Sequence, residues 1–158
     1  MVESGSKWGK KGGKWGMFIG EYQHSLDEKS RVIVPAKYRE QLGTCFILTK
    51  GLDGCLFVYP EKEWVNFEQK LKELPLTNTN ARKFVRFFLA GAVECTPDKQ
   101  GRILIPNHLK VYSSIEKDIV FIGMGNRIEV WSSSQWDAYN DDAFDANALA
   151  EQMETLGI

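Results

Sequence analysis

The chain has 158 residues, of which 43% are hydrophobic and 26% charged, and its formal net charge is -1. This composition suits an ordinary globular protein of one or two small domains, and its charge excludes a global basic signature. Binding to nucleic acid would therefore need a local positive patch. No apolar run approaches the roughly 18 to 20 residues of a membrane-spanning helix, and no hydrophobic signal core follows the N-terminal lysines. We expect a cytoplasmic protein without a membrane partner.

Residues 1–16, MVESGSKWGKKGGKWG, are predicted to be a disordered leader or tag. They hold four lysines against one glutamate, repeat Lys-Trp-Gly and show no apolar period. An expression leader, an upstream stretch translated from a misplaced start, and a true basic arm all fit this pattern. Met17 looks like a natural first residue. From Met17 onward, 20 acidic residues face 16 basic ones, a net charge of -4.

The rest of the chain contains an internal repeat. GEYQHSLDEKSRVIVPAKY, from Gly20, aligns without gaps on GAVECTPDKQGRILIPNHL, from Gly91, at a constant separation of 71. After a one-residue slip the match resumes at a separation of 72, where Trp64 falls on Trp136. We expect a first repeat at 17–64 and a second at 90–136.

Each copy is predicted to contain a strand, a turn, a second strand, a short helical turn begun by proline, and a hairpin. The hairpin strands are expected at 45–49 with 55–59, and at 119–123 with 127–131, because β-branched and aromatic residues dominate these runs. A unit of about 40 to 50 residues rarely closes a core alone. The two copies are therefore predicted to form one α+β fold, a pseudo-two-fold β-barrel with helices packed around it.

Helical patterns lie between and after the copies. In the segment 65–89, apolar residues recur at three and four residues until Pro75, and a second pattern follows in ARKFVRFFLAG. A third, weaker pattern predicts one helix from Gln135 to Met153 within the acidic segment 137–158. The aromatic stripes favour a core or a subunit interface over a cofactor site.

The motifs DEKSR and DKQGR stand at the same place in the two copies, with Asp27 four residues before Arg31 and Asp98 four before Arg102. An Asp can cap the backbone N–H groups of such a turn while the Arg returns toward it. Asp27 and Asp98 are thus predicted to structure their loops. A purely structural bend is the competing interpretation.

Arg31 is the best candidate for contact with a base, because a guanidinium can donate two parallel hydrogen bonds to guanine O6 and N7. Lys29 and Lys37 are expected to meet phosphate. Residues 27–39 carry four cations against two acids, a local excess of +2. This excess is weak for one subunit, and a solvated loop also explains it, but several linked copies would gain by effective concentration.

Nothing in the sequence indicates an enzyme. It has no phosphate-binding loop, no nucleophile elbow and no metal-spaced histidines. Three cysteines without C-x-x-C spacing are best explained as buried thiols, and His24 as a surface or packed histidine. We expect no catalytic residue, no metal, no cofactor and no small-molecule substrate.

MFIGEYQHSLDEKSRVIVPAKYREQL, from Met17, resembles the N-terminal signature of the MraZ family, and GAVECTPDKQGRILIP with FIGMGNRIEVW resembles its second half. The resemblance covers residues 17–156. It implies two AbrB-like (SpoVT-AbrB) units in a swapped-hairpin barrel, and a ring-shaped homo-oligomer associated with the nucleoid. It also implies a regulator of transcription that binds double-stranded DNA at direct repeats upstream of the cell-division and cell-wall gene cluster containing its own gene.

By position, the resemblance assigns DNA contact to the two loops, through Lys29, Arg31, Lys99 and Arg102. The second loop could equally serve the fold or subunit contacts. The family usually has Gly before the motif Arg, as at Gly101, whereas the first copy has Ser30. If that position needs a positive φ, Ser30 is strained by about 1 kcal/mol. The rival function is an AbrB-like antitoxin or another protein-interaction module without an operator.

Overall fold

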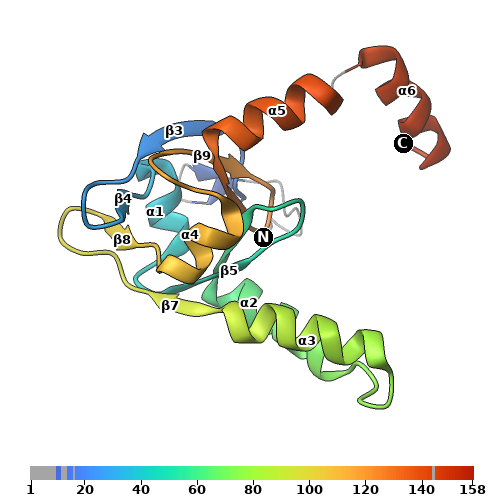
Figure 1. The fold of residues 1–158 in the computed structure, drawn as a ribbon, viewed down its shortest axis with the longest axis horizontal. Coiled ribbons are helices and arrows are strands. Elements are labelled where there is room, and N and C mark those ends of the chain that lie inside the picture. Colours follow the sequence, from blue (N-terminus) through green and yellow to red (C-terminus); the bar gives the residue numbers. More distant parts are fainter. Residues whose placement is uncertain (1–9, 12–13, 16, 144) are drawn as a thin grey trace.

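The computed structural model of the protein describes residues 10–11, 14–15, 17–143 and 145–158 (Figure 1). Its strands are β1 (Lys10–Lys11), β2 (Lys14–Trp15), β3 (Glu21–Ser25), β4 (Arg31–Ile33), β5 (Phe46–Lys50), β6 (Leu56–Pro60), β7 (Val93–Cys95), β8 (Arg102–Leu104), β9 (Asp118–Gly123) and β10 (Ile128–Ser132). Its helices are α1 (Ala36–Leu42), α2 (Glu61–Lys72), α3 (Thr79–Gly91), α4 (Asn107–Ser113), α5 (Ser133–Ala143) and α6 (Ala146–Thr155). In these parts of the chain, no helix is both long and apolar enough to cross a membrane.

The leader predicted at residues 1–16 lies mostly outside the described residues. Its described part forms the two-residue antiparallel pair β1–β2.

The two repeats share one antiparallel sheet. Its strand order is β3-β9-β10-β6-β5-β7, so that β3 of the first copy pairs with β9 of the second, and β7 of the second copy pairs with β5 of the first. When each strand is replaced by its counterpart in the other copy, the same strand order results, read in the opposite direction. The mixed fold of strands and helices built on a duplicated unit is confirmed. The sheet itself is open, because β3 and β7 have a strand neighbour on one side only among the described residues, and the predicted pseudo-two-fold β-barrel is not confirmed.

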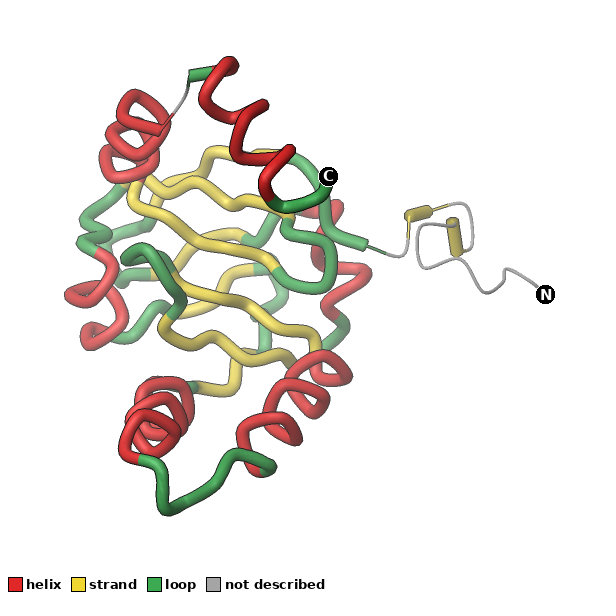
Figure 2. Tube along the Cα trace, turned by 90° about the vertical axis from the view of Figure 1, so that its right-hand side faces the viewer, coloured by secondary structure: helices red, strands yellow, loops and turns green. Residues whose placement is uncertain are grey.

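Helices cover both faces of the sheet because β6 alternates its side chains between two cores. Leu56 and Val58 belong to a core that also contains Tyr38 of α1 and Leu109 of α4. Phe57 and Tyr59 belong to a second, aromatic core with residues of α2, α3 and α5. The hairpin α2–α3 and the pair α5–α6 extend from opposite ends of the molecule (Figures 1 and 2). The ribbon β4–β8 closes the first core, through Val32 and Ile103.

The predicted hairpins are present to within one residue, and α1 and α4 begin directly after Pro35 and Pro106. The single helix predicted from Gln135 to Met153 is wrong, since α5 and α6 are separate. Asp145 explains the separation. Its backbone is extended, and its side chain accepts hydrogen bonds from the N–H groups of Asn147 and Ala148, which starts a new helix.

Tyr38 connects α1 to the segment before β3. Its ring is buried, and its hydroxyl lies 3.0 and 2.9 Å from the carbonyl oxygens of Ile19 and Gly20. We expect Tyr38→Phe to lower the free energy of unfolding by about 1 kcal/mol, because the carbonyl oxygens of Ile19 and Gly20 lose the donor in these partly buried hydrogen bonds. Urea unfolding measures this loss. The exposed Tyr139 provides the control, since Tyr139→Phe should change stability by less than about 0.5 kcal/mol. Equal stability of the two variants would contradict the role of the Tyr38 hydroxyl.

Candidate nucleic-acid interface

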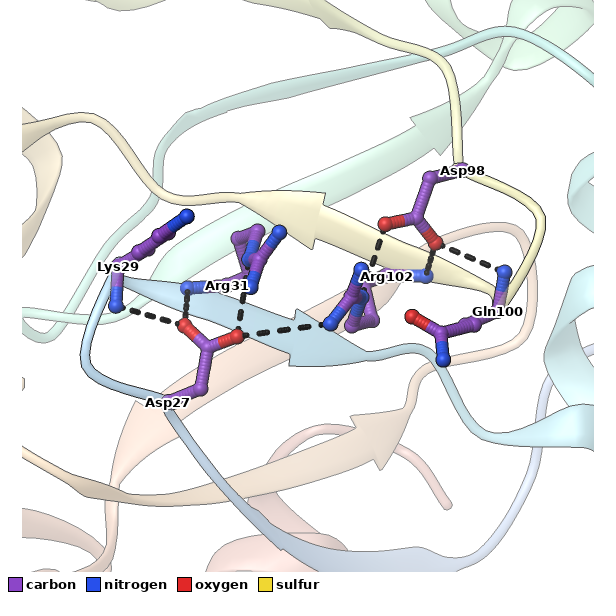
Figure 3. A network of polar contacts seen from close by, with 6 residues as sticks. All are labelled: Asp27, Lys29, Arg31, Asp98, Gln100 and Arg102. Carbon is purple, nitrogen blue, oxygen red and sulfur yellow. Dashed lines mark hydrogen bonds and ion pairs between the residues drawn. The ribbon is translucent and has the colours of Figure 1, made fainter.

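The two predicted loops meet at a two-stranded ribbon. Strands β4 and β8 pair antiparallel, with Arg31 opposite Leu104 and Ile33 opposite Arg102. Side chains alternate along a strand, so the buried Val32 and Ile103 point into the core and the other four point outward. Figure 3 shows the two arginines side by side on this ribbon, between the loops that carry Asp27 and Asp98. We call the surface formed by Arg31, Ile33, Arg102 and Leu104 the ribbon face.

Asp27 organises the first loop through both of its carboxylate oxygens. Its Oδ1 accepts hydrogen bonds from the backbone N–H groups of Lys29 and Arg31, each at 2.9 Å. Its Oδ2 accepts one from the Nε of Arg31 at 2.8 Å. The backbone N–H of Ser30 donates to the Asp27 carbonyl, which closes the turn. The loop therefore holds the Arg31 guanidinium in a defined direction.

The second loop repeats this geometry atom for atom. Asp98 Oδ1 accepts from the backbone N–H groups of Gln100 and Arg102, and Oδ2 accepts from Arg102 Nε at 2.8 Å. One contact joins the loops, because Arg102 Nη1 also lies 3.9 Å from Asp27 Oδ2 (Figure 3). Among the described residues, Arg102 thus forms ion pairs with the carboxylates of both Asp27 and Asp98, whereas Arg31 pairs with Asp27.

Both carboxylates keep their charge at physiological pH. Hydrogen bonds from the backbone N–H groups, that of the motif Arg first in each case, lower the pKa of Asp27 and of Asp98 below the ordinary value of 3.8. Because the folded pKa values are depressed, the stability that these groups contribute is present above about pH 3.8 and is lost as the pH falls through the lower folded values. The loops are expected to keep their shape throughout the neutral range.

A residue with positive φ stands at the tip of each loop. Ser30 has φ 61° and Gly101 has φ 79°. The first copy therefore has Ser in place of the family's usual Gly at a backbone position that is strained for any residue with a β-carbon. Lys110 of α4 donates a hydrogen bond to Ser30 Oγ at 2.8 Å. At Gly101, the guanidinium of Arg39 from α1 occupies the space of a β-carbon. Arg39 and Lys110 are equivalent in the repeat, so each copy covers the loop tip of the other with one cation.

We expect Gly101→Ala to lower the free energy of unfolding by about 1 to 2 kcal/mol, because Ala is strained at positive φ. The new methyl group also displaces the Arg39 guanidinium. Gly125→Ala is the matched control, since Gly125 has φ 84° and open space around it. Urea unfolding of both variants, each also in an Arg39→Ala background, separates strain from displacement. A Gly101→Ala protein as stable as the parent would contradict this account of the loop tip.

The predicted site residues do not all gather. Asp27, Arg31, Asp98 and Arg102 form the network of Figure 3, and Lys29 lies exposed in the first loop. Lys99 lies exposed in the second loop. Lys37 is exposed in the first turn of α1 and is not part of that network.

Sequence reasoning missed four residues here: Arg39, Lys110, Ile33 and Leu104. The constant separation of 71 relates the two cations and also relates the two apolar residues. The repeat alignment could therefore have paired them, but it could not show which loop each cation covers.

The remaining titratable candidates lie in packed surroundings. Burial, and then the charge of Arg39, lower the pKa of His24, whose ring packs edge-to-face on Phe121 at 5.6 Å. Cys55 and Cys95 are buried and Cys45 is partly buried. Burial raises the pKa of the Cys95 thiol to about 12. Within the described ranges, no three His, Cys, Asp or Glu residues gather as metal ligands.

Known proteins match the chain over nearly all of its length from Met17 onward. A family model described as "MraZ protein, putative antitoxin-like" matches twice, over residues 17–87 and 88–156. The chain belongs to the MraZ family. The transcriptional regulator MraZ of Clostridium acetobutylicum is 61% identical over 142 residues, which cover 90% of this chain and 100% of that relative. The MraZ regulators of Clostridium tetani and Acetivibrio thermocellus are 58% and 57% identical, with the same coverage.

MraZ relatives are named as regulators of transcription, which supports the expected role of this chain in the regulation of transcription. The double match of the MraZ model also agrees with the duplicated loops, since each matched segment contains one Asp-x-x-x-Arg motif.

Proposed function

We propose that this chain regulates transcription by binding double-stranded DNA through its ribbon face. The proposed operators are direct repeats upstream of the cell-division and cell-wall gene cluster, including the chain's own promoter. The observation that best supports this proposal is the hydrogen bond that Arg31 Nε donates to Asp27 Oδ2 at 2.8 Å. This bond holds the Arg31 guanidinium on the outward side of the ribbon, where Arg102 also lies. A two-stranded ribbon has the size to enter the major groove, where sequence is read. Nucleoid association in the cytoplasm follows from this proposal.

The geometry favours Arg31 as the base-reading residue. With Nε engaged by Asp27, its two terminal nitrogens can donate in parallel to guanine O6 and N7. Arg102 is held in the same way, but its Nη1 also lies near Asp27, so less of its guanidinium is free. We assign Arg31 the main base contact and Arg102 a secondary one.

Positive charge is concentrated in the two segments that contain the loops and the ribbon strands. Residues 27–39 carry four cations and two acids, and residues 98–110 carry three cations and one acid, so each segment has a net charge of +2. The chain from Met17 onward nevertheless has a net charge of -4. Phosphates are attracted to such a local patch, and Lys29, Lys37 and Lys99 are the exposed candidates to contact them.

We also propose a ring-shaped homo-oligomer, built by contact between opposite ends of adjacent subunits. Helix α3 contains three cations, no acid and an exposed Phe84, whereas no residue of α6 is buried and Leu149 and Met153 lie exposed on it. Residues 137–158 contain six acids and no Lys or Arg. The α2–α3 and α5–α6 ends therefore complement each other in charge, and each exposes apolar side chains. Contact between two different surfaces closes into a ring when the rotation allows it.

Phe84→Asp tests this interface. Its side chain is 56% exposed, so we expect little change in stability but dissociation to smaller species, because the new acid faces an acidic partner helix. Light scattering at micromolar concentration gives the mass. Val111→Asp, at a 70% exposed position of α4 outside both of these ends, is the matched control and should keep the parental mass. A monomeric parent protein would overturn the ring.

DNA binding is tested by titrating the protein on the fragment upstream of its own gene and on a shuffled fragment of equal composition. Specific affinity should exceed non-specific affinity by at least about a thousandfold at physiological salt. Both affinities should fall as salt rises. Equal affinity for the two fragments would favour the rival, an antitoxin-like protein-interaction module without an operator.

A further inference from the structure

The ribbon face exposes two apolar side chains between its arginines. Ile33 is 44% exposed and Leu104 is 56% exposed, although both belong to strands whose inward residues are almost fully buried. They occupy equivalent positions of the repeat and face the solvent on either side of the pseudo-two-fold relation.

The register decides what must cover them. Leu104 lies directly across the ribbon from Arg31, and Ile33 lies directly across from Arg102. Such cross-strand side chains start about 5 Å apart, so a surface that contacts both arginines also covers the two apolar residues. The same partner must therefore offer hydrogen-bond acceptors and apolar groups within a short distance.

The major groove of DNA offers both kinds of group. Guanine presents the acceptors O6 and N7, and thymine presents a C5-methyl group. Resting on the proposed DNA-binding function, we propose that Ile33 and Leu104 contact thymine methyl groups beside the guanines read by Arg31 and Arg102. These two residues then contribute to operator choice by selecting thymine over cytosine, which lacks the methyl group.

Deoxyuridine isolates this contact, because it pairs like thymidine and lacks only the C5-methyl group. The probe is the fragment upstream of the chain's own gene, prepared once with thymidine and once with deoxyuridine throughout. The parent protein should bind the deoxyuridine fragment at least about fourfold more weakly for each methyl group lost from a contact. In the double variant Ile33→Thr, Leu104→Thr, the ratio of the two affinities should approach one. Threonine retains the preference for strands.

Leu76→Thr is the matched control, since it replaces an exposed leucine in the loop between α2 and α3, outside the ribbon face, and it should keep the parental ratio. Equal binding of the two fragments by the parent protein would overturn the inference while leaving the proposed function intact. An unchanged ratio in the double variant would overturn it as well, and a change of oligomeric mass in that variant would then identify a second copy of the chain as the partner of this face. Failure to bind the thymidine fragment would remove the proposed function itself, and this inference with it.

Discussion

Arg31→Ala is expected to abolish specific operator binding while fold and oligomer remain intact. The Arg31 side chain lies on the outward side of β4, and among the described residues its guanidinium pairs with Asp27, so its removal opens no cavity. The substitution removes the paired hydrogen bonds to guanine, which contribute about 1 to 3 kcal/mol of binding free energy in each subunit that contacts the DNA. With two subunits engaged, affinity for the upstream fragment should fall by more than about 30-fold. Fluorescence anisotropy measures the affinity, and thermal unfolding and light scattering verify the protein.

Two further variants separate charge from geometry. Arg31→Lys keeps the positive charge but cannot form two parallel hydrogen bonds, so it should retain non-specific affinity and lose specificity. Arg102→Ala should cause a smaller loss of DNA affinity but a measurable loss of stability, because Arg102 neutralises both Asp27 and Asp98.

Near-parental operator affinity in Arg31→Ala would refute the role assigned to that residue.

Cooperation between repeats has the second large expected effect. A subunit whose residues from Met17 onward carry a net charge of -4, with only small local excesses of +2, should bind one isolated repeat poorly at physiological salt, since few counterions are released. Two or more correctly spaced repeats let adjacent subunits of one oligomer bind together. Linkage of this kind raises apparent affinity by roughly 10² to 10⁴ without any new contact.

The spacing of the repeats tests this cooperation. Insertion of about five base pairs, half of the roughly 10-base-pair turn, rotates one repeat to the opposite side of the duplex and should remove most of the gain. Insertion of about ten base pairs is the control for length alone, and should be tolerated better. Titrations on one repeat, on natural repeats and on both inserted forms are made at a single salt concentration. Equal affinity for all of these would refute multivalent binding.

Local structure was largely predictable because the sequence pattern of each element occurs twice, once in each copy of the repeat. Pro35 and Pro106 correctly marked the starts of two helices, and the hairpins were located to within one residue. The single helix across Asp145 was wrong because a weak apolar period hid an effective capping residue. The predicted β-barrel is not confirmed, because strand number and pairing depend on contacts between distant segments, which leave β3 and β7 as edges of the sheet.

The candidate site was predictable in composition but not in assembly. Spacing alone indicated that Asp27 and Asp98 could cap their turns, since the capped groups are at most four residues away. The placement of Arg39 over Gly101 and of Lys110 on Ser30 depends on how the two copies cross, which no local pattern contains. The pairing of β4 with β8, which places Leu104 beside Arg31 and Ile33 beside Arg102, likewise depends on contacts between the two copies.

The most direct measurement of the central claim, that the ribbon face reads DNA, is nuclease footprinting on the fragment upstream of the chain's own gene with the parent and Arg31→Ala proteins side by side. The parent protein should protect a series of short, regularly spaced direct repeats, and Arg31→Ala should protect none of them at the same concentration. A footprint shared by both proteins would show that another surface reads the sequence. Absence of any footprint with the parent protein would contradict operator binding altogether.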